Sequence, residues 1–231
     1  MSEPAPSLYL LDTHAFVYAM FHAVGPMTSP DGRQTNAVFG VTRDLMNICD
    51  EIRPTYLLCV FDREGPTFRD KIAPDYKQHR PPPPPDLIAQ IPLIHQVLEG
   101  MQLPILGEVG YEADDVIATV ATAGAARGLD VSICSSDKDC RQLINDKIRL
   151  FNLRKKTSMD RPGLYVDWGV TPEQVVDFQT LVGDSVDNVK GVKGIGEKTA
   201  AKLLQEYGTL DNLLANVEKI KQPKMKQNLK D

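Results

Sequence analysis

Three short apolar runs in this chain each lead into an aspartate. The runs and their aspartates are Leu8–Leu11 with Asp12, Leu57–Phe61 with Asp62, and Val131–Cys134 with Asp137. Runs of four to six apolar residues rich in branched and aromatic side chains are typical of buried strands. If the strands are parallel, their carboxyl ends meet at one edge of the sheet, where ligands bind. The pattern therefore predicts that the three aspartates converge there.

Helical patterns separate the predicted strands, at roughly Val38–Ile52, Asp86–Met101 and Ala113–Ala123. Strand and helix in alternation favour a mostly parallel sheet with helices on its faces, so the fold class is α/β. After Pro172 the chain is helical and punctuated by glycines, without a strand pattern. We expect an α/β core over residues 7–170 and a smaller helical subdomain over residues 171–231.

Composition limits the class of protein. Hydrophobic residues make up 42% and charged residues 25%, as in ordinary soluble globular proteins. The four cysteines are scattered without a C-x-x-C pair, which argues against a zinc site and for a reducing compartment. The N-terminus lacks a signal-peptide pattern, and no apolar run approaches ~18 residues. These features predict a soluble cytoplasmic protein without a membrane segment.

Carboxylates concentrate at five places in the sequence. They are Asp12; Asp62; Glu112, Asp114 and Asp115; Asp137 and Asp139; and Asp184 and Asp187. Gathered without cations, these groups would repel one another, and hard divalent cations with oxygen ligands relieve that repulsion. The absence of histidine and cysteine from the set favours Mg²⁺ or Mn²⁺ over zinc. For the YEADD stretch, Tyr111–Asp115, acidic residues that complement a helix dipole remain the alternative interpretation.

The net charge is consistent with this interpretation. The formal charge of −5 would become +4 without the nine carboxylates, so the rest of the chain is mildly basic, as a phosphate binder should be. Two Mg²⁺ ions about 3.5–4 Å apart would suit hydrolysis of a phosphodiester. Structural calcium fits poorly, since no EF-hand loop spacing is present.

The segment NVKGVKGIGEKTAA, residues 188–201, is rich in glycine and lysine. Gly191 and Gly196 match half of a P-loop, but Glu197 stands where that motif requires lysine. We therefore reject an ATPase site. A helix-hairpin-helix is the better interpretation, because a G-I-G turn and the next helix N-terminus can hold a backbone phosphate.

A second basic segment, Pro66–Arg80, interleaves cations with Phe68 and Tyr76, an arrangement typical of single-strand binding. A solvated helix face is the alternative. The prolines that follow, Pro81–Pro85, favour an extended spacer before a helix that Asp86 would cap.

Taken together, these motifs resemble the 5′ nuclease domain of bacterial DNA polymerase I, in the flap endonuclease superfamily. The motifs are VFD, TFR, YKQHR, YEADD, SDKD and GDSVDNVKGVKGIGEKTA, and the resemblance covers nearly the whole chain. It implies a PIN-like or resolvase-like core with a helix-hairpin-helix subdomain, and a truncated C-terminal end.

The resemblance also assigns roles to residues. Asp12, Asp62, Glu112 and Asp114 resemble one metal cluster with Asp115 beside it, whereas Asp137, Asp139 and Asp187 resemble a second, supported by Asp184. Lys77 and Arg80 match the catalytic basic pair at the scissile phosphate. The residues expected to contact DNA are Phe68, Arg69, Tyr76, Lys190, Lys193, Gly194, Gly196, Lys198 and Thr199. A K⁺ ion at the glycine turn is implied as well.

By this resemblance, the chain cuts 5′ flaps, nicks and 5′ ends of DNA, including RNA primers in hybrid duplexes, by two-metal-ion catalysis. Two departures from the family pattern bear on this function. His14 lies in a motif that usually reads D-G-S, and we interpret it as a surface histidine rather than a metal ligand. Ala19 stands where the family usually carries a phosphate-binding arginine. A catalytically weakened DNA-binding module is therefore the alternative function.

Overall fold

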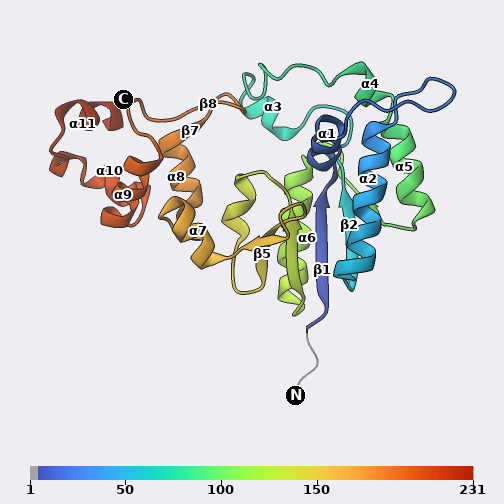
Figure 1. Cartoon of the computed structure of the whole chain (residues 1–231). Coiled ribbons are helices and arrows are strands. Elements are labelled where there is room, and N and C mark those ends of the chain that lie inside the picture. Colours follow the sequence, from blue (N-terminus) through green and yellow to red (C-terminus); the bar gives the residue numbers. More distant parts are fainter. Residues whose placement is uncertain (1–4, 231) are drawn as a thin grey trace. The chain divides into compact units, whose positions relative to one another are not determined.

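The computed structural model describes residues 5–230, which form two compact units (Figure 1). Neither unit is one continuous stretch of sequence. The first contains residues 5–68, 81–136 and 147–158, and the second contains residues 69–80, 137–146 and 159–230. The second unit thus includes two short segments from within the predicted α/β core. The division at residue 170 stays a prediction.

A six-stranded sheet forms the centre of the first unit, in the order β3-β2-β1-β4-β5-β6. The strands are β1 (Ser7–Asp12), β2 (Tyr56–Val60), β3 (Ile105–Leu106), β4 (Asp130–Cys134), β5 (Ile148–Asn152) and β6 (Thr157–Met159). β1 pairs in parallel with both β2 and β4. β2 with β3 and β4 with β5 are also parallel pairs. The predicted α/β class and all three predicted strands are confirmed.

β3 is short for a chemical reason. The peptide N–H of Cys59 donates to the carbonyl of Pro104, but Pro104 has no N–H to return to β2. The ladder therefore begins one residue later, where Cys59 pairs with Ile105.

The helices that accompany the sheet of the first unit follow the predicted pattern but differ from it in their bounds. The helices are α1 (Thr13–Ala23), α2 (Asn36–Asn47), η1 (Ile48–Ile52), α4 (Pro85–Ile88), α5 (Ile91–Gly100) and α6 (Ala113–Ala126). The short helix α3 (Phe68–Ile72) has only Phe68 in the first unit, and its other residues belong to the second. The helix predicted over Val38–Ile52 ends in a π-helical turn, η1. The helix predicted over Asp86–Met101 is two helices, α4 and α5, with a break between them. α4 begins at Pro85, so Asp86 lies in its first turn and is not its cap.

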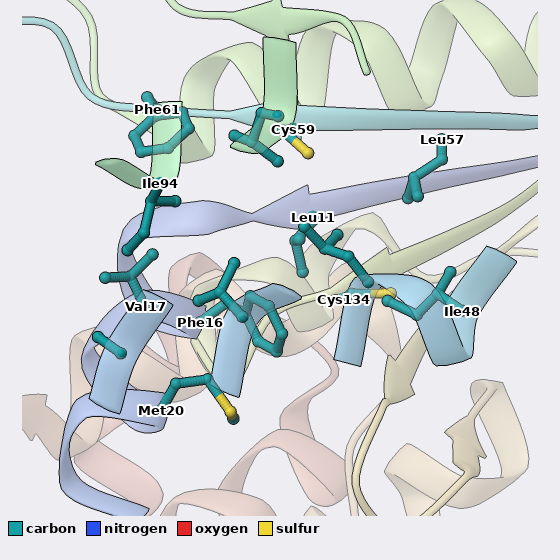
Figure 2. Close-up of a cluster of buried hydrophobic side chains, with 14 of the residues drawn as sticks. Leu11, Phe16, Val17, Met20, Ile48, Leu57, Cys59, Phe61, Ile94 and Cys134 are labelled. Carbon is teal, nitrogen blue, oxygen red and sulfur yellow. The ribbon is translucent and has the colours of Figure 1, made fainter. Parts of the chain in front are cut away.

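One hydrophobic cluster of the first unit lies between the sheet and helices α1, α2 and α5 (Figure 2). Leu11 of β1, Leu57 of β2 and Cys134 of β4 pack there with Phe16 and Met20 of α1. Because β1 is buried along almost its whole length, its run of apolar residues needs no alternation. This packing fixes the carboxyl ends of β1 and β2.

The four cysteines, all among the described residues, form no disulfide, and three of them are buried. Burial raises the pKa of the Cys59 thiol to about 12 and raises the pKa of Cys134 further still. Buried thiols of this kind pack as small apolar side chains and react slowly.

The second unit is mainly helical. Its elements are η2 (Asp139–Leu143), α7 (Arg161–Trp168), η3 (Pro172–Gln174), α8 (Val175–Val182), β7 (Gly183–Asp184), β8 (Val189–Lys190), α9 (Glu197–Tyr207), α10 (Leu210–Ala215), η4 (Val217–Lys219) and α11 (Pro223–Lys230). The expectation of no strand after Pro172 is wrong, since β7 and β8 pair antiparallel. They are only two residues long, too short for a period-2 pattern to reveal. No helix among the described residues combines the length and apolar character needed to cross a membrane.

The core of the second unit joins α8 and α9. Phe178 and Leu181 of α8 pack with Leu204 of α9, and the Trp168 ring stacks on Phe178 with centroids 4.6 Å apart. This core carries the β7–β8 hairpin, because β7 follows α8 directly.

Candidate functional site

The first carboxylate group consists of Asp12, Asp62, Glu112, Asp114 and Asp115, all in the first unit. Asp12 is the last residue of β1 and lies opposite Val60, the last residue of β2. Asp62 follows two residues later. The structure therefore brings these two aspartates to the carboxyl ends of neighbouring parallel strands, as predicted.

Asp12 is buried, with 7% of its surface exposed. Burial raises its pKa above the ordinary value, and the nearby Asp62 carboxylate adds to the rise. Two hydrogen bonds oppose that rise. Ser135 Oγ donates to Asp12 Oδ2 over 2.8 Å, and the Ala15 amide donates to Oδ1 over 3.2 Å, which makes Asp12 the N-cap of α1.

The YEADD stretch is the N-terminus of α6. Glu112 is its N-cap and forms a capping box with Asp115, whose Oδ2 accepts from the Glu112 amide over 3.0 Å. The Ala113 amide donates to Asp62 Oδ1 over 2.7 Å. Asp114 lies half-buried in the first turn of the same helix. The helix-start interpretation is thus confirmed for Glu112 and Asp115, and their part in metal binding stays a prediction.

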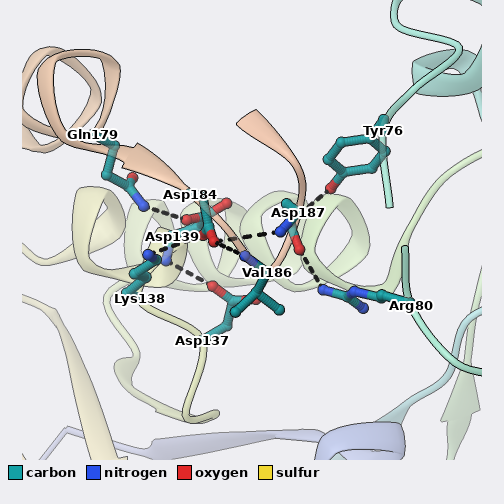
Figure 3. A network of polar contacts seen from close by, with 9 residues as sticks. All are labelled: Tyr76, Arg80, Asp137, Lys138, Asp139, Gln179, Asp184, Val186 and Asp187. Carbon is teal, nitrogen blue, oxygen red and sulfur yellow. Dashed lines mark hydrogen bonds and ion pairs between the residues drawn. The ribbon is translucent and has the colours of Figure 1, made fainter. Parts of the chain in front are cut away.

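The second carboxylate group consists of Asp137, Asp139, Asp184 and Asp187, all in the second unit (Figure 3). Asp184 closes β7, and its Oδ1 accepts from the amides of Val186 and Asp187 over 2.8 and 3.3 Å. Asp137 Oδ1 accepts from the Asp139 amide over 2.8 Å. Each pair of carboxylates is thus held by the backbone of its own loop.

Cations and amides of the same unit contact this second group. Lys138 Nζ lies 3.0 Å from Asp184 Oδ2, and the Gln179 amide donates to Asp139. Burial alone would raise the pKa of Asp184, but the bonds from Lys138 and from the Val186 amide lower it overall. Lys138 belongs to the SDKD motif, so its contact with the carboxylates of this group could have been predicted from the sequence, and we did not predict it. Gln179 had no such signal.

Asp187 is buried against the basic segment. Arg80 Nη2 lies 2.5 Å from Asp187 Oδ1, and the Tyr76 hydroxyl donates to Oδ2 over 3.1 Å (Figure 3). The Lys77 amide donates to the Asp187 carbonyl over 3.1 Å, and the Lys77 ammonium lies 4.9 Å from the Tyr76 ring centroid. The sequence predicted a metal ligand at Asp187 and a phosphate contact at Arg80. In this structure the two side chains bind each other.

The remaining predicted DNA contacts are spread over both units. In the first unit, Phe68 is 39% exposed and packs against Tyr111 with centroids 5.7 Å apart. In the second, Gly194 has φ +82° in a turn closed by the Ile195 amide, which donates to the Val192 carbonyl. Arg69 lies on α3, and Lys190 closes β8.

The glycine turn leads directly into α9. Gly196 is the N-cap of α9 and offers no side chain to the first amides of the helix. Lys193 and Lys198 are exposed on either side of this N-terminus, and Thr199 is half-buried in its first turn. A helix N-terminus of this kind suits a phosphate. The predicted turn followed by a helix is therefore present.

The carboxylates of Asp12 and Asp62 are oxygen donors, the kind of ligand that hard divalent cations take. Over residues 5–230, no three histidine, cysteine, aspartate or glutamate side chains come close enough to enclose a metal ion by themselves. Mg²⁺ keeps several waters and is bound through one or two carboxylates. The coupled pair of Asp12 and Asp62, which offers oxygen ligands only, fits that requirement.

Two glycines let the β7–β8 hairpin close. A Cβ atom on Gly191 would lie 2.2 Å from the carbonyl carbon of Val182, and one on Gly183 would lie 2.3 Å from the Gly191 nitrogen. We expect Gly191→Ala to lower the free energy of unfolding by about 1–3 kcal/mol, because the hairpin must open to admit the methyl group. Urea denaturation measures the change.

Gly100→Ala in α5 is the matched control, since no atom lies within 4 Å of its added Cβ. It should leave stability unchanged or raise it by about 0.5–1 kcal/mol. Equal stability of Gly191→Ala and the wild type would refute the steric role of Gly191.

Comparisons with known proteins agree with this architecture. Residues 7–169 match the family described as "5'-3' exonuclease, N-terminal resolvase-like domain", and residues 170–231 match "5'-3' exonuclease, C-terminal SAM fold". A 5'-3' exonuclease of Aquifex aeolicus is 41% identical over 213 residues, covering 92% of this chain and 74% of that protein. DNA polymerase I of Rhizobium leguminosarum is 41% identical over 230 residues, and this chain spans 23% of its length.

Solved structures share the fold at low identity. The T5 5'-exonuclease with bound zinc is 21% identical with a TM-score of 0.78, covering 96% of this chain and 83% of that one. The catalytic core of Rad2 with DNA is 18% identical with a TM-score of 0.62, covering 98% and 72%. The family resemblance and the fold class predicted from the sequence are both confirmed. The chain belongs to the 5'-3' exonuclease family, with the resolvase-like and SAM folds both present.

Proposed function

We propose that this chain hydrolyses phosphodiester bonds at 5′ flaps, nicks and 5′ ends of DNA with two Mg²⁺ or Mn²⁺ ions. One observation carries the proposal: a buried aspartate, Asp12, and an exposed one, Asp62, lie at the ends of adjacent parallel strands. A carboxylate is costly to bury next to another unless a cation is bound. The relatives named as exonucleases and flap endonucleases support the same activity.

The two carboxylate groups would each hold one ion. Asp12, Asp62, Glu112 and Asp114 would be the ligands in the first group, with Asp115 beside them. In the second group, the ligands are Asp137, Asp139 and Asp187, with Asp184 in support. When bound, such ions stabilise the developing charge on the phosphate and activate water. Neighbours in the same fold were solved with divalent metal ions.

Residues of the chain itself would position the substrate. Lys77 and Arg80 supply positive charge at the scissile phosphate, and Tyr76 and Phe68 offer rings for stacking of unpaired bases. For Arg80, this role requires that its ion pair with Asp187 break. A metal ion bound to Asp187 would then supply the positive charge that Arg80 provides in this structure.

The glycine turn and the N-terminus of α9 would hold duplex DNA. Lys190, Lys193 and Lys198 neutralise phosphates, whereas Gly194, Gly196 and Thr199 offer backbone and hydroxyl donors, with K⁺ at the turn. RNA primers in hybrid duplexes are a further proposed substrate. We propose that the protein acts as a cytoplasmic, nucleoid-associated monomer.

The weakened DNA-binding module remains the second candidate because of Ala19. One contact argues against a loss of catalysis caused by Ala19. The Arg154 guanidinium donates to the Ala19 carbonyl over 3.0 Å, so a cation lies at this turn of α1 although residue 19 carries none.

Cleavage of a 5′-flap duplex tests the proposal. We expect cleavage in Mg²⁺ or Mn²⁺, none in excess chelator, and DNA binding without cleavage in Ca²⁺, because the ligands are all oxygen atoms. Quantified cleavage products and a binding assay on the same DNA provide the measurement. Cleavage at full rate in chelator would contradict metal dependence. Binding of the flap in Mg²⁺ without any cleavage would favour the binding module.

A further inference from the structure

The imidazole of His14 is held against the loop that carries Asp62. His14 is the second residue of α1, two positions after Asp12. Its Nδ1 lies 3.1 Å from the amide nitrogen of Asp62 and 3.2 Å from Oδ2 of the same residue. The ring also packs edge-on against Phe61, with centroids 5.1 Å apart, and Phe61 in turn stacks on His95. His14 is therefore more constrained than the surface histidine that the sequence suggested.

Asp62 is the exposed carboxylate of the first group, whereas the others are buried or half-buried. It follows the end of β2, in a loop, and 48% of its side chain is exposed. An exposed aspartate has several rotamers available, and only one can face a given ion. The Ala113 amide binds Oδ1, so α6 restrains one carboxylate oxygen. His14 restrains the main chain or the second oxygen of the same residue.

One ring nitrogen cannot form both bonds at once. With the proton on Nε2, Nδ1 accepts from the Asp62 amide. With the proton on Nδ1, it donates to Oδ2. Either bond fixes Asp62, the first through its backbone and the second through its carboxylate. His14 therefore restrains Asp62 in either tautomer.

We propose that His14 is a positioning residue that orients Asp62 for a divalent cation and is not itself a ligand. This inference rests on the proposed function, which makes Asp62 a ligand. Partners that hydrogen-bond to ligating carboxylates typically contribute 10–100-fold to metal affinity.

Three variants test the proposal by Mn²⁺ titration, with bound metal followed by electron paramagnetic resonance. His14→Phe keeps the ring against Phe61 but removes the nitrogen, and should weaken Mn²⁺ binding by about 10–100-fold. His14→Asn restores a short polar group that can accept from the amide or donate to the carboxylate, and should recover most of that affinity. His95→Phe applies the same replacement to the other histidine of the stack and should bind Mn²⁺ as the wild type does.

The outcomes separate the claims. Thermal melts in chelator should be equal for the wild type and His14→Phe, since a lower melt would signal a merely structural role. If His14→Phe binds Mn²⁺ as tightly as the wild type, or if His14→Asn loses as much Mn²⁺ affinity as His14→Phe, the positioning role is overturned and the proposed function stands. No saturable Mn²⁺ binding by the wild type would instead overturn the proposed function, and this inference with it.

Discussion

Asp12→Asn is expected to lower the rate of DNA cleavage about 10³-fold and to raise the melting temperature of the metal-free protein. The rate falls because the variant loses a charged ligand, and several kcal/mol of transition-state stabilisation corresponds to about three factors of ten. The melting temperature rises because a buried charge beside Asp62 is removed. Single-turnover cleavage in Mg²⁺ and thermal melts in chelator measure the two effects.

The amide can preserve the hydrogen bonds of the carboxylate. Its oxygen can accept from the Ala15 amide as an N-cap, and its nitrogen can donate to Ser135 Oγ. Asp12→Ala is the matched control, because it also removes the charge but loses the cap, at a cost of about 0.5–2 kcal/mol. Cleavage by Asp12→Asn at the wild-type rate would show that Asp12 is no ligand. If Asp12→Asn melts at a lower temperature than the wild type in chelator, the buried charge of Asp12 does not destabilise the metal-free protein.

The part of the site built on strand ends could be predicted from the sequence. Apolar runs mark β1 and β2, and in a parallel sheet the residues that follow adjacent strands must be neighbours. Asp12 and Asp62 meet for this reason alone. Local rules were also sufficient for the turn at Gly194, because glycine readily adopts the positive φ of +82° that this turn requires.

For the YEADD stretch, the local sequence pattern was consistent with two different roles. The sequence allowed a helix start or a metal cluster, and the structure uses Glu112 and Asp115 as a capping box. The two roles do not exclude each other, since a carboxylate has two oxygens and more than one lone pair on each. An acidic stretch at a helix N-terminus therefore cannot be assigned from its local contacts alone.

The contacts missed by the sequence join residues far apart in the chain. Arg80 and Asp187 are separated by 107 residues, and His14 and Asp62 by 48. No periodicity or capping rule predicts such pairs, because they depend on how separate elements pack. For the same reason, the sequence did not predict that residues 69–80 and 137–146 would cluster with the helical part of the chain.

Arg80→Ala and Lys77→Ala are expected to slow cleavage by about 10²–10³-fold while changing DNA affinity little. Removing one donor that faces developing charge typically has an effect of that size. Lys193→Ala and Lys198→Ala should do the opposite. Each should leave the rate under saturating DNA unchanged. Each should also reduce the slope of the logarithm of the DNA-binding constant against the logarithm of the salt concentration by about 0.9, as expected for one lost phosphate contact. Single-turnover rates and binding at several salt concentrations separate the two classes.

Arg80 needs a further control because its guanidinium also neutralises the buried carboxylate of Asp187. Arg80→Ala leaves that carboxylate without its ion pair, so a lower rate alone could reflect a disturbed hairpin. Adding Asp187→Asn to Arg80→Ala removes the uncompensated charge and should restore the melting temperature in chelator, which would assign the loss of stability to the broken ion pair. Lys147→Ala, just before β5, where Lys147 forms an ion pair with Asp130, is the matched lysine control and should change neither rate nor salt dependence. If Arg80→Ala cuts saturating DNA at the wild-type rate, Arg80 serves Asp187 alone and has no part at the phosphate.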